Sequence, residues 1–169
     1  MLVFAGGVGR AGSRRRPVQR RGAALVEGAL YLLPFLAVLF GIMDFGVAIW
    51  MKNTIQHAVR EGVRYAVTYQ TAAGMGHDSS IKQVVKRQSM GVIRTEADLA
   101  KVMVRYFHPT TLAEVGQNSP GNIVEVSVEN LAHKWMIPFW WGKTPLQLSA
   151  RASDRMEGLP GGLSAPPAR

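Results

Sequence analysis

The residues that could do chemistry stand where a charged segment meets an apolar one. Arg20 and Arg21 lead into an apolar run that contains an isolated acid, Glu27. A carboxylate at the centre of a membrane helix costs roughly 2.5 to 3.5 kcal/mol, so an acid is excluded from such a run unless something uses it. The sequence therefore indicates that Glu27 has a specific partner.

No other group of side chains has the spacing of a reactive site. His57, His77, His108 and His133 share no ligand spacing, and we interpret them as scattered surface residues. The absence of cysteine excludes disulfides, thiolate metal sites and a cysteine nucleophile. Residues 71–169 contain no paired carboxylates, nucleophile motif or phosphate loop. We therefore expect no catalytic residues, no metal and no cofactor.

The net charge of +9 comes mostly from one end of the chain, where six arginines and no acid occur in the first 22 residues. Such a basic segment is typical of a leader that meets an anionic membrane face, and it argues against a nucleic-acid partner. By the positive-inside rule, it predicts a cytoplasmic N-terminus and an exported C-terminus. The residues that set this orientation are Arg14, Arg15, Arg16, Arg20 and Arg21.

The run from Gly28 to Met51 carries a single charge, Asp44, and is long enough for one membrane span. We expect residues 23–51 to form the transmembrane half of a helix. Glu27 and Asp44 are about 25 Å apart along such a helix, so both acids are expected near the edges of a hydrocarbon core of about 30 Å.

The helix is expected to continue outside the membrane, over residues 52–72. Trp50 and Lys52 would form the outer-interface anchor. Beyond them the apolar residues recur every three or four positions, which predicts an amphipathic helix with one buried face. These residues are Ile55, Ala58, Val59, Gly62, Val63, Ala66 and Val67.

A small α+β exported domain is predicted over residues 73–157. A short helix, capped by Ser79 or Ser80, would extend to about Met90. Alternating residues predict an antiparallel sheet that packs on the outer half of the long helix. The expected strands are Lys101 to Phe107, Ile123 to Glu129 and Leu146 to Ser153. Residues 158–169 have the composition of a flexible tail.

The stretch from Met136 to Gly142 groups three aromatic residues beside Met136, Ile137 and Pro138. Two interpretations stand equally. It is an interaction or membrane-touching patch, or it is a loop that folds over the sheet.

Three strings together resemble a known family: RRGAALVE before the apolar run, FGIMDFG within it, and HAVREGVRYAVT after it. They resemble the TadE-like proteins, pseudopilins of the tight-adherence (Flp/Tad) pilus system, over about residues 20 to 70. Gly28 stands where family members usually have Phe or Tyr. The resemblance implies a type IV pilin-like fold and an inner-membrane protein with an exported domain. It also implies partners: prepilin peptidase, other pilin subunits, the inner-membrane assembly machinery and membrane lipid.

The resemblance further implies that prepilin peptidase removes a leader, residues 1–22, by cutting between Gly22 and Ala23. Glu27 would then be the fifth residue of the mature chain. Cutting would create an α-amino group on Ala23, mostly protonated at neutral pH. This cation could pair with Glu27 of its own chain or with Glu27 of a neighbour, and the sequence does not choose between them.

Physical arguments support the same site, since Gly22 lets an enzyme approach its carbonyl and the arginines hold the bond at the cytoplasmic face. In the alternative interpretation the arginines flank a stop-transfer helix and Glu27 favours a helix N-terminus. The protein would then be a single-pass anchor for an exported binding domain, with no leader processing. A membrane-tethered enzyme is the weakest of the three classes.

Overall fold

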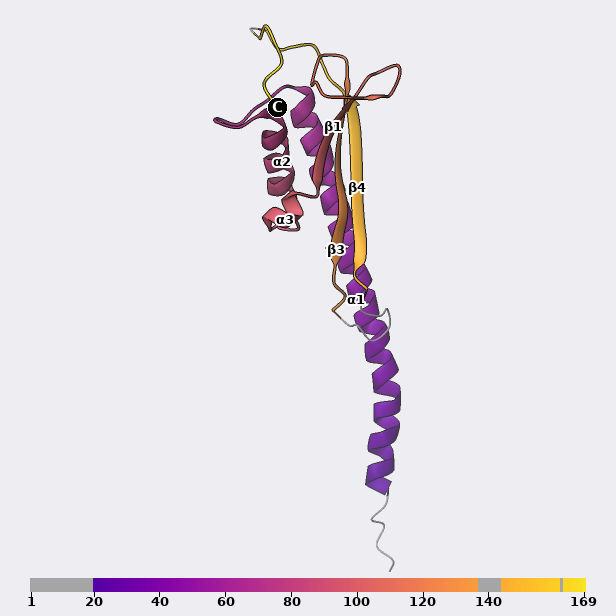
Figure 1. Cartoon of the computed structure of the whole chain (residues 1–169). Helices are drawn as coiled ribbons and strands as arrows, with labels where there is room; N and C mark the ends of the chain where they lie inside the picture. The colour runs from indigo at the N-terminus through magenta and orange to yellow at the C-terminus, as the bar shows by residue number, and fades with distance from the viewer. Residues whose placement is uncertain (1–19, 137–143, 162) are drawn as a thin grey trace, which may run out of the picture. The chain divides into compact units, whose positions relative to one another are not determined.

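The computed structural model describes residues 20–136, 144–161 and 163–169 of the chain. The predicted α+β class is confirmed: a long N-terminal helix is followed by a short helix and a small antiparallel sheet. The one-turn helix α3 and the two-residue strand β2 were not predicted. In chain order, the elements are α1 (Arg20–Val67), α2 (His77–Gln88), α3 (Glu96–Leu99), β1 (Val102–Phe107), β2 (Glu114–Val115), β3 (Ile123–His133) and β4 (Leu146–Arg155) (Figure 1).

The chain divides into two compact units, Met1–Leu39 and Phe40–Arg169, and α1 contributes to both. In the first unit, the described residues are the N-terminal part of α1. The second unit holds the rest of α1 together with the shorter helices and the sheet. All packing described below lies within this second unit.

The sheet has the strand order β2-β1-β3-β4, and each neighbouring pair is antiparallel. β3 was predicted to end at Glu129, but it continues to His133. The difference has a local cause, because Asn130 has a φ of 54° and the register of β3 against β4 shifts between Val128 and Leu131. This β-bulge changes the phase of the apolar alternation, so that Leu131 and His133 are buried again.

β4 lies at the edge of the sheet, next to β3 alone. Its alternation was predicted correctly: Leu148 and Ala150 are buried and Leu146 and Ala152 are half-buried, while the residues that alternate with them are exposed. A carbonyl of this edge strand, that of Arg151, accepts a hydrogen bond of 2.9 Å from Nε2 of Gln56 on α1. The helix therefore contacts the backbone of the edge strand as well as the apolar side chains of the sheet.

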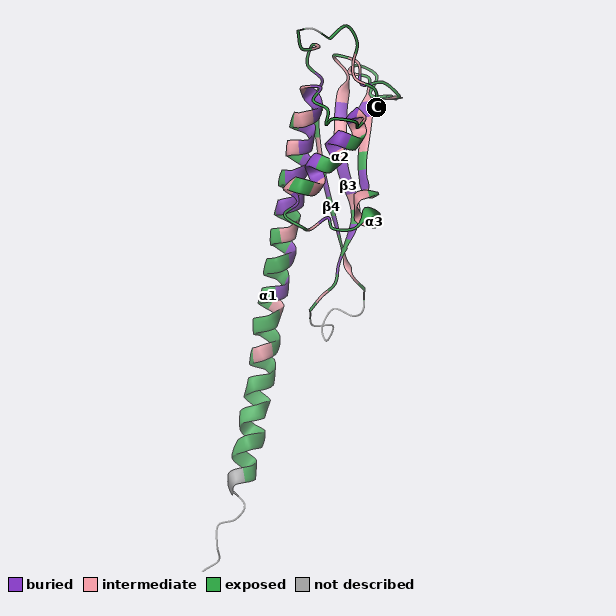
Figure 2. Ribbon diagram, turned by 90° about the vertical axis from the view of Figure 1, so that its left-hand side faces the viewer, coloured by how far each residue is buried: buried purple, intermediate pink, exposed green. Residues whose placement is uncertain are grey.

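The core lies between one face of α1 and the inner face of the sheet. All seven residues of the predicted amphipathic face, from Ile55 to Val67, are buried. Opposite them, Val124, Val126 and Val128 of β3 are fully buried. Figure 2 shows α1 with buried positions beside the sheet and with exposed positions toward its N-terminal end. Each valine or isoleucine side chain in this core stabilises the fold by about 1.5 to 3 kcal/mol through removal from water.

The outer face of β3 departs from simple alternation at Ser127. Alternation along Ile123 to Glu129 predicts that this residue is exposed to solvent, but it is only 1% exposed. Longer side chains cover it. Arg105 forms ion pairs with Glu125 at 3.8 Å and with Glu129 at 3.3 Å, and Glu129 also accepts a hydrogen bond from the Ser127 hydroxyl. Strand alternation predicts which face a residue points to, but it does not predict cover by charged neighbours on that face.

The start of α2 also differs from its prediction. The helix begins at His77 after Gly76, so Ser79 and Ser80 lie inside it rather than at its N-cap. The Ser80 hydroxyl instead donates to the Gly76 carbonyl at 2.8 Å and accepts from the Ala72 amide at 3.0 Å. Ser80 therefore ties the loop that follows α1 to the first turn of α2.

Close packing of α1 on α2 at Gly62 gives a first testable prediction. A Cβ atom at Gly62 would lie 2.6 Å from Cγ2 of Val85, a stiff side chain that is fully buried. We expect Gly62→Ala to lower the free energy of unfolding of the detergent-solubilised protein by about 1 to 3 kcal/mol. In a Val85→Ala background the same substitution should cost much less. A stabilisation by Gly62→Ala alone, of the size expected from helix propensity, would contradict this contact.

Candidate functional site

The predicted processing site lies in the first turn of α1. The helix begins at Arg20, so the peptide bond between Gly22 and Ala23 is within its first four residues. Amide groups of the first turn have no carbonyl partner within the helix, so this turn unwinds at the lowest cost. Both residues are exposed, and a Cβ atom at Gly22 would meet no other atom within 4 Å.

The basic residues that precede this bond cannot be examined in the same way. Arg14, Arg15 and Arg16 lie outside the described residues, and the side chains of Arg20 and Arg21 are not described. Their role in orientation therefore stays a prediction from the sequence.

Glu27 is exposed on α1, one turn beyond Ala23. Within the described part of the chain, no hydrogen bond or ion pair to Glu27 is found. In the uncut chain Ala23 contributes a backbone amide and not a charged amine. The predicted ion pair between the Ala23 amine and the Glu27 carboxylate therefore cannot form in that chain. Glu27 is therefore an exposed carboxylate for which the described residues provide no partner.

The helix around Glu27 presents an apolar surface. By length and composition, one helix in the described residues could cross a membrane, over Gly22–Val67. This surface would be strongly unfavourable in water, at about 25 cal/mol per Å² of apolar area. Its exposed large side chains are Leu25, Val26, Leu30, Tyr31, Leu32, Leu33, Phe35, Val38, Leu39, Phe40, Ile42 and Met43.

Asp44 is the first buried residue along this apolar stretch, which continues with exposed side chains at Phe45, Ile49 and Trp50. It has a role that the sequence did not indicate. It was expected near the outer membrane interface as a second acid, yet its side chain is 1% exposed. Its Oδ1 accepts a hydrogen bond of 3.1 Å from the backbone amide of Met136, just beyond the end of β3. The next residue, Phe45, packs on Trp135 with ring centroids 5.6 Å apart. Helix α1 thus holds Lys134–Met136, the described residues that follow β3, which we call the hairpin end.

The sequence indicates that Asp44 needs a partner, but it does not indicate which group that partner is. An acid inside an apolar run requires a partner, as argued for Glu27. The donor lies 92 residues further along the chain and is a backbone amide, which no side-chain motif can reveal. Of the aromatic stretch between Met136 and Gly142, only Met136 lies within the described residues, so neither interpretation of that stretch is tested.

Two of the four histidines are buried, which corrects the interpretation of all four as surface residues. His77 is 0% exposed and His133 is 8% exposed, whereas His57 and His108 are exposed. In the described residues no group of three or more His, Cys, Asp or Glu side chains could hold a metal ion.

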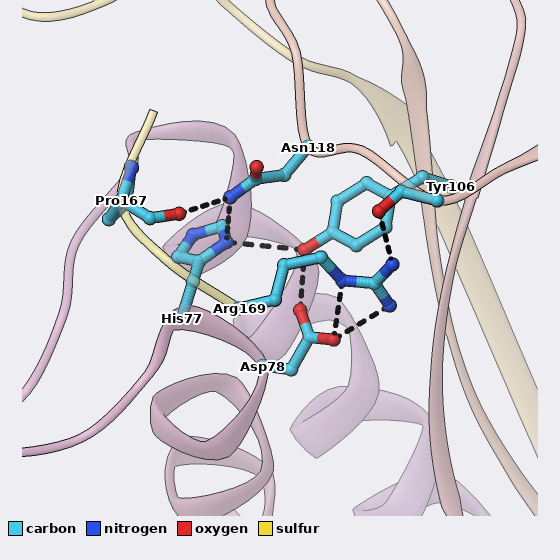
Figure 3. A network of polar contacts seen from close by, with 7 residues as sticks. His77, Asp78, Tyr106, Asn118, Pro167 and Arg169 are labelled. Atoms are coloured by element: carbon cyan, nitrogen blue, oxygen red, sulfur yellow. Dashed lines mark hydrogen bonds and ion pairs between the residues drawn. The ribbon is translucent and has the colours of Figure 1, made fainter. Parts of the chain in front are cut away.

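His77 belongs to a buried polar network (Figure 3). Its Nδ1 lies 3.1 Å from Nδ2 of Asn118 and 3.2 Å from the hydroxyl of Tyr106. The Tyr106 hydroxyl donates to Oδ1 of Asp78 at 2.9 Å. Because Nδ2 of Asn118 can only donate, Nδ1 of His77 accepts, and we assign the imidazole proton to Nε2.

Arg169 contacts two members of this network, Asp78 and Tyr106, at its solvent-exposed side. Its guanidinium forms an ion pair with Asp78 at 2.8 Å and lies 4.8 Å from the centroid of the Tyr106 ring. A flexible tail was expected over residues 158–169 from composition, whereas the described residues at its end make specific contacts. Those contacts involve positions far away in sequence, so composition could not indicate them.

The backbone of the tail adds two hydrogen bonds to the same site. The amide of His77 donates to the Ala168 carbonyl at 2.7 Å, and Nδ2 of Asn118 donates to the Pro167 carbonyl at 2.9 Å. No substrate could reach the His77 imidazole without displacing these residues. The network therefore holds the tail against α2, and its buried position does not suit a reactive centre.

Comparison with known proteins concerns α1. Residues 22–64 match the family model described as TadE-like protein. This segment is TadE-like. No curated protein and no solved structure matches the chain. The resemblance noted from the sequence is confirmed over these residues.

The TadE-like segment includes Gly22, Ala23, Glu27 and Asp44, and it ends at residue 64. The sheet, α2 and the His77 network lie beyond it. The family match therefore covers the predicted processing site, the apolar surface and the contact of α1 with the hairpin end.

The His77 network predicts a pH dependence of stability. Burial, followed by the nearby Arg169 charge, lowers the pKa of His77 below its ordinary 6.5, although Asp78 and the Ala66 backbone act in the opposite direction. Between this lowered pKa and 6.5 the unfolded chain binds more protons than the folded chain, so the free energy of unfolding decreases as the pH is lowered from 6.5 through the folded pKa. We expect the melting temperature to drop between pH 7 and pH 5.

A matched pair of variants checks this assignment. His77→Gln removes the titrating group and should flatten the profile of melting temperature between pH 7 and pH 5. The same substitution at the exposed His57 should leave the profile unchanged. Equal profiles for His77→Gln and the parent protein would show that another group causes the dependence.

Proposed function

We propose that the protein is a pseudopilin-like component of Flp/Tad pilus assembly, which acts by packing α1 against other pilin subunits after prepilin peptidase has removed its leader. The observation that carries the proposal is the TadE-like match, which starts at Gly22 and covers the exposed apolar surface around Glu27. A single-pass anchor with an exported binding domain and no processing is the alternative.

Membrane insertion is the first step. The exposed apolar side chains from Leu25 to Met43 favour lipid over water, and the arginines before them favour the cytoplasmic face by about 1 kcal/mol each. Insertion with this polarity leaves the sheet and α2 on the exported side of the inner membrane. The uncut chain would be held there by its leader and by α1 together.

Cleavage between Gly22 and Ala23 is the second step. The bond lies in the first helical turn, which is exposed and lacks internal hydrogen-bond partners for its amides. Prepilin peptidase could therefore bind this turn in an unwound form without disturbing the folded domain. The reaction hydrolyses one peptide bond and leaves an α-ammonium group on Ala23.

Pairing of this cation with Glu27 is the third step. A charge left alone in a lipid-facing contact is unfavourable by several kcal/mol, so a pair between neighbouring chains would select one register among apolar helices. The exposed surface of α1 around Glu27 leaves room for such a neighbour. Assembly would then depend on processing, because the uncut leader withholds the amine.

Gly22→Leu tests the cleavage step. Because a Cβ atom at position 22 would have no other atom within 4 Å, we expect normal insertion and loss of cleavage. N-terminal sequencing of the membrane-extracted protein should give Ala23 for the parent. Gly28→Leu is the control, since position 28 is equally open and should still be cut. A parent protein that starts at Met1 supports the simple anchor, and normal cutting of Gly22→Leu excludes this site.

Glu27→Gln tests the pairing step. We expect insertion and cleavage to be retained, and photo-crosslinking from position 30 to other pilin subunits to fall at least fivefold in cells that make the pilus. Leu30 is exposed one turn from Glu27, so a crosslinking residue there reports on the same surface. Glu61→Gln makes the same chemical change in the exported part of α1 and should crosslink normally. Equal crosslinking for Glu27→Gln and the parent would overturn the role of the carboxylate.

A further inference from the structure

We propose that the outer boundary of the membrane lies at Asp44, where the end of the β3–β4 hairpin sits on α1, and that this hairpin end rests on the phosphate-bearing headgroups of the outer leaflet. The inference depends on the membrane insertion described under the proposed function. It places the boundary about two turns before Trp50 and Lys52, which the sequence had suggested as the outer anchor.

The backbone of the hairpin end sets the depth limit. β3 ends at His133, and Lys134 to Met136 have no regular secondary structure. Irregular backbone does not occur in contact with lipid hydrocarbon, because its amides and carbonyls would lack partners there. The Met136 amide lies 3.1 Å from the Asp44 carboxylate, so both groups share the same depth. The hydrocarbon region therefore has to end on the N-terminal side of Asp44.

The length of α1 agrees with this limit. From Ala23 to Met43 the helix spans about 30 Å, which matches the thickness of a hydrocarbon core. In this stretch every residue is exposed except Leu36 and Gly41, which are partly exposed. The first buried residues of α1 appear at Asp44, followed by Ala48 and Ile55. Between them Phe45, Val47, Ile49 and Trp50 stay exposed, as apolar side chains at the level of the headgroups would be.

The side chains at the hairpin end have the chemistry of a membrane interface. Lys134 is exposed, Trp135 is partly exposed, and Met136 is 60% exposed. A lysine can reach lipid phosphates while tryptophan occupies the boundary between headgroups and acyl chains. Trp135 is held in position by the ring of Phe45 at 5.6 Å and that of His133 at 5.8 Å. The hairpin end thus presents a fixed aromatic and basic edge to the bilayer.

Depth measurement with spin labels tests the proposal. Because the chain has no cysteine, single cysteines can be introduced and labelled in the full protein. The protein is reconstituted in vesicles of phosphatidylcholine and phosphatidylglycerol, and each label is tested for collisions with oxygen and with a water-soluble nickel chelate. The labelled positions, all exposed, are Leu33, Ile42, Trp50, Met90 and Met136.

We expect labels at Leu33 and Ile42 to favour oxygen, as in hydrocarbon, and labels at Trp50 and Met90 to favour the nickel chelate, as in water. The label at Met136 should report the headgroup depth between them. Hydrocarbon depth at Trp50 would overturn the boundary, and full water exposure at Met136, equal to Met90, would overturn the headgroup contact. Water exposure at Leu33 would instead refute membrane insertion, which separates failure of the proposed function from failure of this inference.

Two variants test whether Asp44 positions the hairpin end. Asp44→Asn keeps a side-chain oxygen that can accept from the Met136 amide, whereas Asp44→Ala removes it. We expect the label at Met136 to become more mobile and to leave the headgroup depth in Asp44→Ala, and to keep both properties in Asp44→Asn. An unchanged signal in Asp44→Ala would show that Asp44 does not set the position of the hairpin end.

Discussion

Helix α1 combines two different surfaces, one exposed and apolar and one buried under the sheet, and the packing of the remaining elements depends on the second. Toward its N-terminus α1 exposes large apolar side chains, and from Ile55 to Val67 it buries a single face under the sheet. The first arrangement is stable in lipid and the second in water. Asp44 lies at the change between them, where a polar side chain is buried by protein instead of by solvent.

Much of this arrangement could be predicted because it depends on local periodicity. Apolar spacing located the buried face of α1. A composition rich in strand-forming residues located β1, and alternation located β3 and β4, each within a few residues of its ends. Periodicity failed where one residue broke the phase, as at Asn130 in β3. It also failed where a side chain made a bond of its own to the backbone, as Ser80 does at the start of α2. Such features depend on individual dihedral angles and on partners from other segments.

Some residues of the candidate site could be predicted from the sequence and others could not. Glu27 and the bond after Gly22 could be found because an acid in an apolar run and a glycine after arginines are local signals. The contacts of Asp44 and His77 could not, because they join residues between 29 and 92 positions apart. Burial of both side chains depends on tertiary packing, and the sequence alone contained no motif that required it.

The bond from Gln56 to the Arg151 carbonyl has a consequence for how copies of the chain can meet. An edge strand normally offers its backbone groups to any strand that comes alongside, and crowding of many copies in one membrane would favour that exchange. Here a side chain of α1 already occupies one of these acceptors, and the charged side chains of Arg151 and Arg155 oppose approach of a like strand. Growth of a continuous sheet from chain to chain is thereby discouraged, which leaves the helices as the surfaces through which copies can associate without aggregating.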